Sequence, residues 1–165
     1  AFLPLYPVTI VYPIPHVKWL HWMDEETGEI SPGRKSPKKG NAYQAFIELY
    51  KIRPFLKDPN LRLRLDLIDM EEYRLLNGWS RDKKKGSDRI PLTFVEEVRV
   101  DRREDYMQFI PYEIPEEFTA KDFAACAKIP LRLAQTVLLI LTDLLIVERI
   151  GKQGRSYLYR ICEIE

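Results

Sequence analysis

The stretch "FTAKDFAACAKIPLRLAQTVLLILTDL", residues 118–144, has the strongest helical pattern in the chain. Thr119 and Asp122 have the spacing of a capping box, so a first helix is expected to begin directly after Thr119. Pro130 suits the first turn of a second, longer helix. The apolar residues that recur at helical spacing define the core side of that helix: Ala134, Val137, Leu138, Leu141 and Leu145. The stretch therefore predicts two helices joined by a tight connection.

The segment that follows these helices predicts a β-hairpin. In "VERIGKQGRSYLYRI", residues 147–161, two alternating strands flank the turn "GKQG". This order of helix, turn, long helix and hairpin resembles winged helix-turn-helix DNA-binding domains over about one third of the chain. The resemblance implies that the second helix enters a major groove and that the hairpin, or wing, contacts phosphate. It assigns base or phosphate contacts to Arg132, Gln135 and Thr136, and wing-tip contacts to Lys152, Gln153 and Arg155.

Two features of this segment depart from the winged-helix pattern. The usual glycine after the long helix is replaced by Leu144 and Leu145, and residues 111–165 carry seven Lys or Arg against eight Asp or Glu, a net charge of −1. The helix end is also apolar nearly all round, which predicts burial on two sides, by the N-terminal domain or by a second copy. Because winged helices also dock proteins, a protein-interaction module, or a homodimer through the apolar end of helix 130–145, stays open as an alternative.

The composition changes near Pro111, where "PYEIPEEFT" indicates a Pro- and Glu-rich linker. We therefore expect an α+β chain of two domains, residues 1–110 and residues 111–165. The first is expected to be a mixed α/β domain with an antiparallel-type sheet. Its strands are predicted in "VTIVYPI", "VKWLHWM", "LRLRLDLID" and "IPLTFVEEVRV", and its helices in "AYQAFIELYKIR", "MEEYRLL" and "REDYMQFI".

Local signals place these N-terminal elements. Asn41 and Gln44 have capping-box spacing at the start of the first predicted helix, and Asp69 and Glu72 would cap "MEEYRLL". "DEETGE" predicts a turn in which Gly28 adopts positive φ. The alternation in "LRLRLDLID" predicts one buried strand face, formed by Leu61, Leu63, Leu65 and Leu67.

Two basic stretches of the N-terminal part are candidate phosphate contacts. The first, "RKSPKKG", contains no acid and leads into the helix predicted at Asn41, where the helix dipole would favour an anion. The second spans residues 81–89, and both stretches hold Gly and Ser residues whose backbone N–H groups would be free to bind phosphate. The alternative is that both are solvated loops. The candidate residues are Arg34, Lys35, Lys38 and Lys39 in the first, and Lys83, Lys84 and Lys85 in the second.

A cluster of carboxylates raises a metal-dependent nuclease as an alternative function. Such an enzyme needs two or three carboxylates around Mg²⁺, and Asp66, Asp69 and Glu72 are the candidates. The Asp…Glu-x-Lys hairpin typical of these enzymes is not present in clear form, and the spacing of His16 and His21 fits no standard zinc pattern. With no Gly-rich nucleotide motif or nucleophile elbow in the sequence, we expect a binding protein without cofactor, metal or catalytic residues rather than an enzyme.

Bulk properties place the chain among globular proteins. It has 165 residues, 45% of them hydrophobic, and a formal net charge of +1, which argues against a wholly basic nucleic-acid coat. Cys126 and Cys162 are isolated, so free buried thiols in a reducing, cytoplasmic setting are expected. No apolar run approaches the roughly 20 residues that span a bilayer, so no membrane association is expected.

Two N-terminal segments resemble a family of uncharacterised microbial proteins. They are "PHVKWLHWMDEETGEISPGRKSPKKG", residues 15–40, and "EEYRLLNGWSRDKKKGSDRIP", residues 71–91. This resemblance implies a shared organisation and carries no mechanism. Taken together, the sequence predicts a nucleic-acid-binding protein, with double-stranded DNA favoured over RNA, in a regulatory or accessory role. Binding is expected through the basic loops and the wing.

Overall fold

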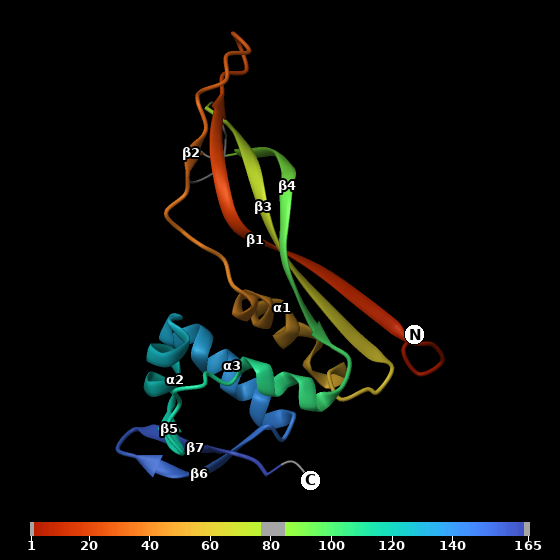
Figure 1. The fold of residues 1–165 in the computed structure, drawn as a ribbon, viewed down its shortest axis with the longest axis vertical. Coiled ribbons are helices and arrows are strands. Elements are labelled where there is room, and N and C mark those ends of the chain that lie inside the picture. Colours follow the sequence, from red (N-terminus) through yellow and green to blue (C-terminus); the bar gives the residue numbers. More distant parts are fainter. Residues whose placement is uncertain (1, 77–84, 164–165) are drawn as a thin grey trace. The chain divides into compact units, whose positions relative to one another are not determined.

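The computed structural model of the chain describes residues 2–76 and 85–163 (Figure 1). The described residues form two compact units, each drawn from separate segments of the chain. Unit 1 is drawn from segments 1–12, 43–64 and 98–165, and unit 2 is drawn from segments 13–42 and 65–97. Helices and strands are both present, so the α+β class is confirmed, whereas the boundary between residues 110 and 111 stays a prediction.

Four strands form the larger sheet: β1 (Val8–Met23), β2 (Arg34–Lys35), β3 (Leu61–Leu75) and β4 (Lys85–Val100), in the order β2-β1-β3-β4. β1 and β3 run in the same direction. Near their first residues Val8 N donates to Asn60 O at 2.8 Å, and near their last residues Leu76 N donates to Met23 O at 3.0 Å. The predicted antiparallel-type sheet is therefore wrong, since the sheet is mixed.

A helical crossover between β1 and β3 permits this parallel pairing, which needs a long connection. It consists of η1 (Ala42–Ala45), α1 (Phe46–Leu49) and η2 (Tyr50–Phe55). The predicted helix is thus confirmed as helical, but only its central turn is α and Pro54 lies inside η2. The Asn41 capping box is wrong, because Asn41 Oδ1 is buried and has no hydrogen-bond partner among the described residues.

The segment "MEEYRLL" is strand rather than helix, and this is the main error of the sequence analysis. β3 buries Leu61, Leu63, Leu65 and Leu67 on one face, as predicted. Beyond Leu67 the alternation shifts by one residue, and the next buried side chains are Met70 and Glu72. The carboxylates that resembled helix caps form side-chain contacts with cationic and histidine side chains of β1 instead.

The C-terminal segment contains η3 (Arg103–Phe109), β5 (Glu117–Thr119), α2 (Ala120–Ala127), α3 (Leu131–Asp143), β6 (Val147–Gln153) and β7 (Ser156–Ile161). Its strands form a second, antiparallel sheet in the order β5-β7-β6. The predicted capping box is confirmed: Asp122 N donates to Thr119 Oγ1, and Thr119 N donates to Asp122 Oδ2 at 2.8 Å. The hairpin is confirmed as well, although β6 continues to Gln153 and the positive φ of 62° falls at Gly154.

Aromatic side chains from distant parts of the sequence form the core of unit 1. Phe46 of α1 has no exposed surface and lies edge-on to Phe109, with ring centroids 4.9 Å apart. Tyr43 packs edge-on to Phe123 of α2 at 6.1 Å. The crossover helices and the C-terminal helices therefore share one core.

Helix α3 contributes the aliphatic part of the same core. Its residues with no exposed surface are Ala134, Val137, Leu138, Ile140 and Leu141. This burial lies within unit 1 and accounts for the apolar end of the helix. Among the described residues, no single helix is long and apolar enough to cross a membrane; α2 and α3 reach that length and composition only as a pair bent by 109°.

Leu145 does not belong to the core, contrary to the prediction, because α3 ends at Asp143, two residues earlier. It is 57% exposed and has a φ of 56°. Ile146 N donates to Leu141 O at 2.9 Å and Leu145 N donates to Thr142 O at 3.1 Å, the hydrogen bonds of a Schellman motif. Leu145 thus occupies the left-handed position that glycine normally takes in this motif.

Replacing Leu145 with glycine is expected to stabilise unit 1 by about 0.5–1 kcal/mol. The left-handed conformation costs a residue with a Cβ about 1–2 kcal/mol, and the greater freedom of glycine in the unfolded chain offsets part of that gain. Denaturant unfolding followed by circular dichroism measures the change. Leu145→Ala is the control, because it shortens the exposed side chain but keeps the Cβ; equal effects of the two substitutions would contradict this account.

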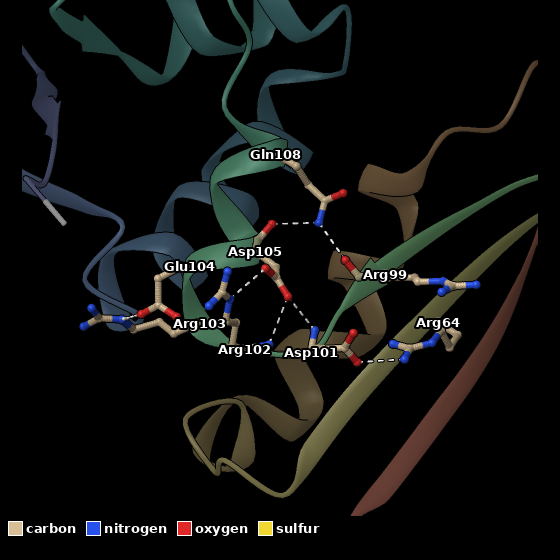
Figure 2. A network of polar contacts seen from close by, with 8 residues as sticks. All are labelled: Arg64, Arg99, Asp101, Arg102, Arg103, Glu104, Asp105 and Gln108. Atoms are coloured by element: carbon tan, nitrogen blue, oxygen red, sulfur yellow. Dashed lines mark hydrogen bonds and ion pairs between the residues drawn. The ribbon is translucent and has the colours of Figure 1, made fainter. Parts of the chain in front are cut away.

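A polar network fixes the turn between β4 and η3 (Figure 2). Asp105 Oδ2 accepts hydrogen bonds from Asp101 N at 2.8 Å and from Arg102 N at 3.1 Å. Burial opposes ionisation of Asp105, but these backbone hydrogen bonds and the Arg102 side chain outweigh it and lower the pKa. Arg64 of β3 pairs with Asp101 at 2.7 Å, so the network joins the strands of unit 1 to η3.

Candidate nucleic-acid interface

The face of α3 that was assigned to base contacts lines a groove in unit 1. Arg132 and Gln135 are exposed, while Thr136 is half-buried and its hydroxyl donates to Arg132 O at 3.1 Å. The three residues lie along one side of a groove of about 970 Å³. The structure therefore brings together the three helix residues that the resemblance singled out.

The other wall of this groove comes from the crossover helices and was missed by sequence reasoning. Ile47, Glu48 and Tyr50 line it, together with Tyr12 of β1. Ile47 and Tyr50 fall at helical spacing with the buried Phe46 and Leu49, yet they are 55% and 49% exposed. Their exposure could not be inferred from helical periodicity, because it depends on how closely α3 packs against this side of the crossover helices.

An ion pair joins η2 to the last residue of α3. Arg53 Nε lies 2.7 Å from Asp143 Oδ2, and both side chains are partly exposed. A molecule that enters the groove to contact Arg132 or Gln135 would also lie beside Ile47 of α1, which lines the same groove.

The predicted wing tip is exposed and cationic. Lys152, Gln153 and Arg155 are all exposed at the end of the β6–β7 hairpin. Lys152 Nζ lies 5.4 Å from the ring centre of Tyr157, and the Arg149 guanidinium lies 4.5 Å from the same ring. Arg149 thus extends the predicted group of cations along the hairpin, and the Tyr157 ring lies against both Arg149 and Lys152.

Three carboxylates of the C-terminal segment have partners of their own, away from the predicted wing tip. Glu148 pairs with Arg160 across the hairpin at 2.7 Å, and Asp143 pairs with Arg53. Hydrogen bonds from the backbone and hydroxyl of Thr119 hold the pKa of Asp122 below its ordinary value. No ion pair joins Lys152 or Arg155 to a carboxylate among the residues that the structure describes.

The first basic stretch, "RKSPKKG", lies in unit 2. Arg34 and Lys35 form β2 opposite Leu20 and Trp19, with Lys35 Nζ 5.8 Å from the Trp19 ring centre. Lys38 and Lys39 follow in a loop, and all four cationic side chains are exposed. Their side chains are therefore accessible to phosphate.

The backbone amides of this stretch do not form the predicted phosphate cradle. Ser36 N donates to Lys18 O at 2.7 Å, and Gly40 N donates to His16 O at 2.8 Å. Lys38 N donates to the Ser36 hydroxyl at 3.3 Å. The long helix whose dipole was expected to favour an anion is not present at this point, since α1 has only four residues and is preceded by η1.

The second basic stretch, residues 81–89, lies partly outside the described residues. Lys83 and Lys84 fall there, and Lys85 is the first residue of β4. The prediction that these three lysines contact phosphate therefore stays a prediction.

The three nuclease candidates lie on β3 but, among the described residues, do not share a contact or a ligand site. Asp69 Oδ1 accepts from Val17 N at 3.0 Å and lies 2.7 Å from His16 Nδ1. Asp66 Oδ1 is buried and has no hydrogen-bond partner within the described part of the chain. Across residues 2–76 and 85–163, no group of three or more His, Cys, Asp or Glu side chains is arranged to hold a metal ion.

Glu72, the third nuclease candidate, is the centre of a buried ionic cluster. It is 5% exposed, and its carboxylate lies 2.8 Å from Lys18 Nζ and 2.6 Å from Arg74 Nη2. Arg89 of β4 lies 3.7 Å from the same carboxylate. Burial alone would raise the pKa of Glu72, but hydrogen bonds and charges from Lys18 and Arg74 outweigh it and lower the pKa. This arrangement neutralises the carboxylate with two strand neighbours.

Comparison with known proteins assigns the N-terminal part of the chain to a family without attaching a function. The chain is 28% identical over 125 residues to an "Uncharacterized protein" of Treponema pallidum (strain Nichols), a match that covers 74% of this chain. The match covers 49% of that relative, so the chain spans about half of its length. No solved structure matches the chain. Residues 1–101 match the family described as "Domain of unknown function (DUF8091)", and the chain belongs to that family.

Proposed function

We propose that the C-terminal part of unit 1 is a winged helix-turn-helix module that binds nucleic acid, with double-stranded DNA favoured over RNA. The role would be regulatory or accessory. The observation that carries the proposal is the exposed, cationic tip of the β6–β7 hairpin, where Lys152 and Arg155 have no carboxylate partner among the described residues. Cations in this position are suited to phosphate contacts, which supply most of the affinity for nucleic acid.

The order of elements supports the winged-helix assignment. A short helix, η3, precedes β5, and the helices α2 and α3 are followed by the β6–β7 hairpin. The first strand pairs with the last, in the sheet order β5-β7-β6. In this assignment α2 is the supporting helix, α3 is the recognition helix and the β6–β7 hairpin is the wing.

Base contacts by α3 would use Arg132 and Gln135, whose side chains can bind base edges with two hydrogen bonds each. Because α1 forms the other wall of the groove, the wing is expected to supply more of the affinity than α3 does. A protein-docking role for the same groove is the second candidate, and the exposed apolar wall formed by Ile47 and Tyr50 favours it.

Reversing both wing charges, Lys152→Glu with Arg155→Glu, is expected to lower the affinity for duplex DNA at least about tenfold. Two lost phosphate contacts should also reduce the slope of log affinity against log salt by about 2. Fluorescence anisotropy with two unrelated duplexes, titrated at several salt concentrations, measures both. The loss should be the same for the two sequences, since phosphate contacts carry no sequence information.

The matched control is Lys57→Glu with Arg62→Glu, which changes the net charge equally at exposed positions of unit 1 away from the hairpin. The pair Lys38→Glu with Lys39→Glu tests the loop of unit 2 in the same way. Arg132→Ala should change the preference between sequences instead. If the wing variant and its control bind DNA equally, or if wild-type protein binds no duplex at low salt, the proposal fails and the protein-docking role remains.

A further inference from the structure

Strand β4 lies at the edge of the larger sheet and presents an apolar surface that nothing in unit 2 covers among the described residues. Only β3 pairs with it in the order β2-β1-β3-β4. All of residues 88–96 are exposed. Ile90, Leu92 and Phe94 alternate along one face, at 45%, 49% and 59% exposure, and Val95 on the other face is 42% exposed. A long, exposed, apolar edge is a ready template for pairing with another strand.

We propose that this edge is a dimer interface, in which β4 pairs antiparallel with β4 of a second copy of the chain. The two-fold axis passes at Thr93, perpendicular to the sheet. Two four-stranded sheets would then join into one continuous sheet across the interface. Such a contact is isologous, so each residue of one strand meets its counterpart reciprocally.

The side chains of β4 are complementary to themselves in this register. With Thr93 at the axis, Leu92 lies opposite Phe94 of the second copy, and Phe94 lies opposite Leu92. Aromatic and aliphatic cross-strand pairs of this kind stabilise a sheet. On the other face, Val95 lies opposite Pro91 on either side of the Thr93 pair, so apolar pairs flank the axis on both faces, and Ile90 lies opposite Glu96.

Neighbouring registers of the same symmetric pairing are less favourable. Moving the axis to Leu92 would set Asp88 opposite Glu96, and moving it to Phe94 would set Arg89 opposite Arg99. Like charges directly opposite each other are destabilising. The register centred on Thr93 avoids both conflicts, so a second copy of β4 fits this edge without placing like charges opposite each other.

Pro91 indicates which backbone groups face outwards. Proline has no N–H, so in an edge strand its nitrogen is tolerated where it points away from the neighbouring strand. Backbone groups that face the same side recur at every second residue, so Thr93 and Val95 face outwards with Pro91. Each Thr93 would then exchange hydrogen bonds with its counterpart, and each Val95 N–H would donate to Pro91 O of the second copy.

The oligomeric state of the full chain tests this inference. Wild-type protein should sediment as a dimer at micromolar concentration, and Leu92→Lys should raise the dimer dissociation constant at least tenfold without changing the far-ultraviolet circular dichroism. Thr93→Pro should have the same effect, because it removes the outward N–H. Thr93→Val, which keeps that N–H, should remain dimeric. A wild-type chain that stays monomeric, or a dimer that survives both Leu92→Lys and Thr93→Pro, would overturn the proposal.

A cysteine at the axis tests the register separately. In a background with Cys126 and Cys162 replaced by serine, Thr93→Cys should form a disulfide between two copies under mild oxidation, since residues facing each other across the axis lie within disulfide reach. Val95→Cys should not, because the two Val95 positions are displaced from each other along the strands. Cross-linking of Val95→Cys with no cross-linking of Thr93→Cys would rule out this register.

Discussion

Phe46→Ala is expected to lower the free energy of unfolding of unit 1 by about 3–5 kcal/mol, the range found for truncating a buried phenylalanine. Phe46 has no exposed surface, and its ring lies against Phe109. Truncation would leave a cavity between the crossover helices and the C-terminal helices. The C-terminal helices should therefore lose stability although the substitution lies far from them in the sequence.

Two spectroscopic probes can follow the two units separately. Trp19 and Trp22 lie in unit 2, and the segments of unit 1 contain no tryptophan. Helix α3, the longest α-helix described, lies in unit 1. Denaturant unfolding followed by circular dichroism at the helix band should shift in the Phe46→Ala variant. Ile47→Ala is the control, because Ile47 is 55% exposed and its truncation should cost less than about 0.5 kcal/mol.

This experiment also decides between two descriptions of the domains. If residues 111–165 fold independently, as the composition change at Pro111 suggested, Phe46→Ala should leave the stability of the C-terminal helices unchanged. If the compact unit of the structure is also the cooperative unit, the helices should unfold together with the crossover. If the unfolding transition of the C-terminal helices is unchanged in Phe46→Ala, the crossover and these helices do not unfold as one cooperative unit.

The parts of the fold that the sequence predicted are those governed by local physics. The Thr119 capping box, the turn at Gly28 and the alternating leucines of β3 depend on residues a few positions apart. The contact of Phe46 with Phe109, and the groove beside Arg132, depend on segments more than sixty residues apart. No local pattern specifies such contacts, so the cationic β6–β7 hairpin could be predicted and the groove wall could not.

The segment "MEEYRLL" shows how a local signal can mislead. Asp69 and Glu72 have the spacing and chemistry of helix caps, and the residues between them favour helix. In the structure these carboxylates lie beside His16 and Lys18 of a parallel neighbour, which is distant in sequence. Tertiary contacts therefore override the local helical preference. Among these carboxylates, substitution of the most buried one, Glu72, is expected to lower the stability most.

Glu72→Ala is accordingly expected to destabilise unit 2 by about 3 kcal/mol, the lower end of the range for breaking a buried ion pair. Glu72 is almost fully buried, whereas the side chains of Lys18 and Arg74 keep 24% and 17% exposure. Some water therefore remains available to the two cations once the carboxylate is gone. Arg74 also lies 5.7 Å from the Trp22 ring centre, so tryptophan fluorescence should report the loss.

The acid dependence of stability separates the charge of Glu72 from its packing. Because Lys18 and Arg74 lower the pKa of Glu72 in the folded state, its contribution is full above the ordinary value of 4.5 and is lost as pH falls through the folded value. Glu72→Gln keeps the shape but has no such proton to bind. The difference in unfolding free energy between wild type and Glu72→Gln should therefore shrink below that pH, as measured by denaturant unfolding at several pH values. A difference that stays constant down to strongly acidic pH would mean that Glu72 acts by packing alone. The ion pairs of Glu72 would then not be what stabilises this part of β3 as a strand.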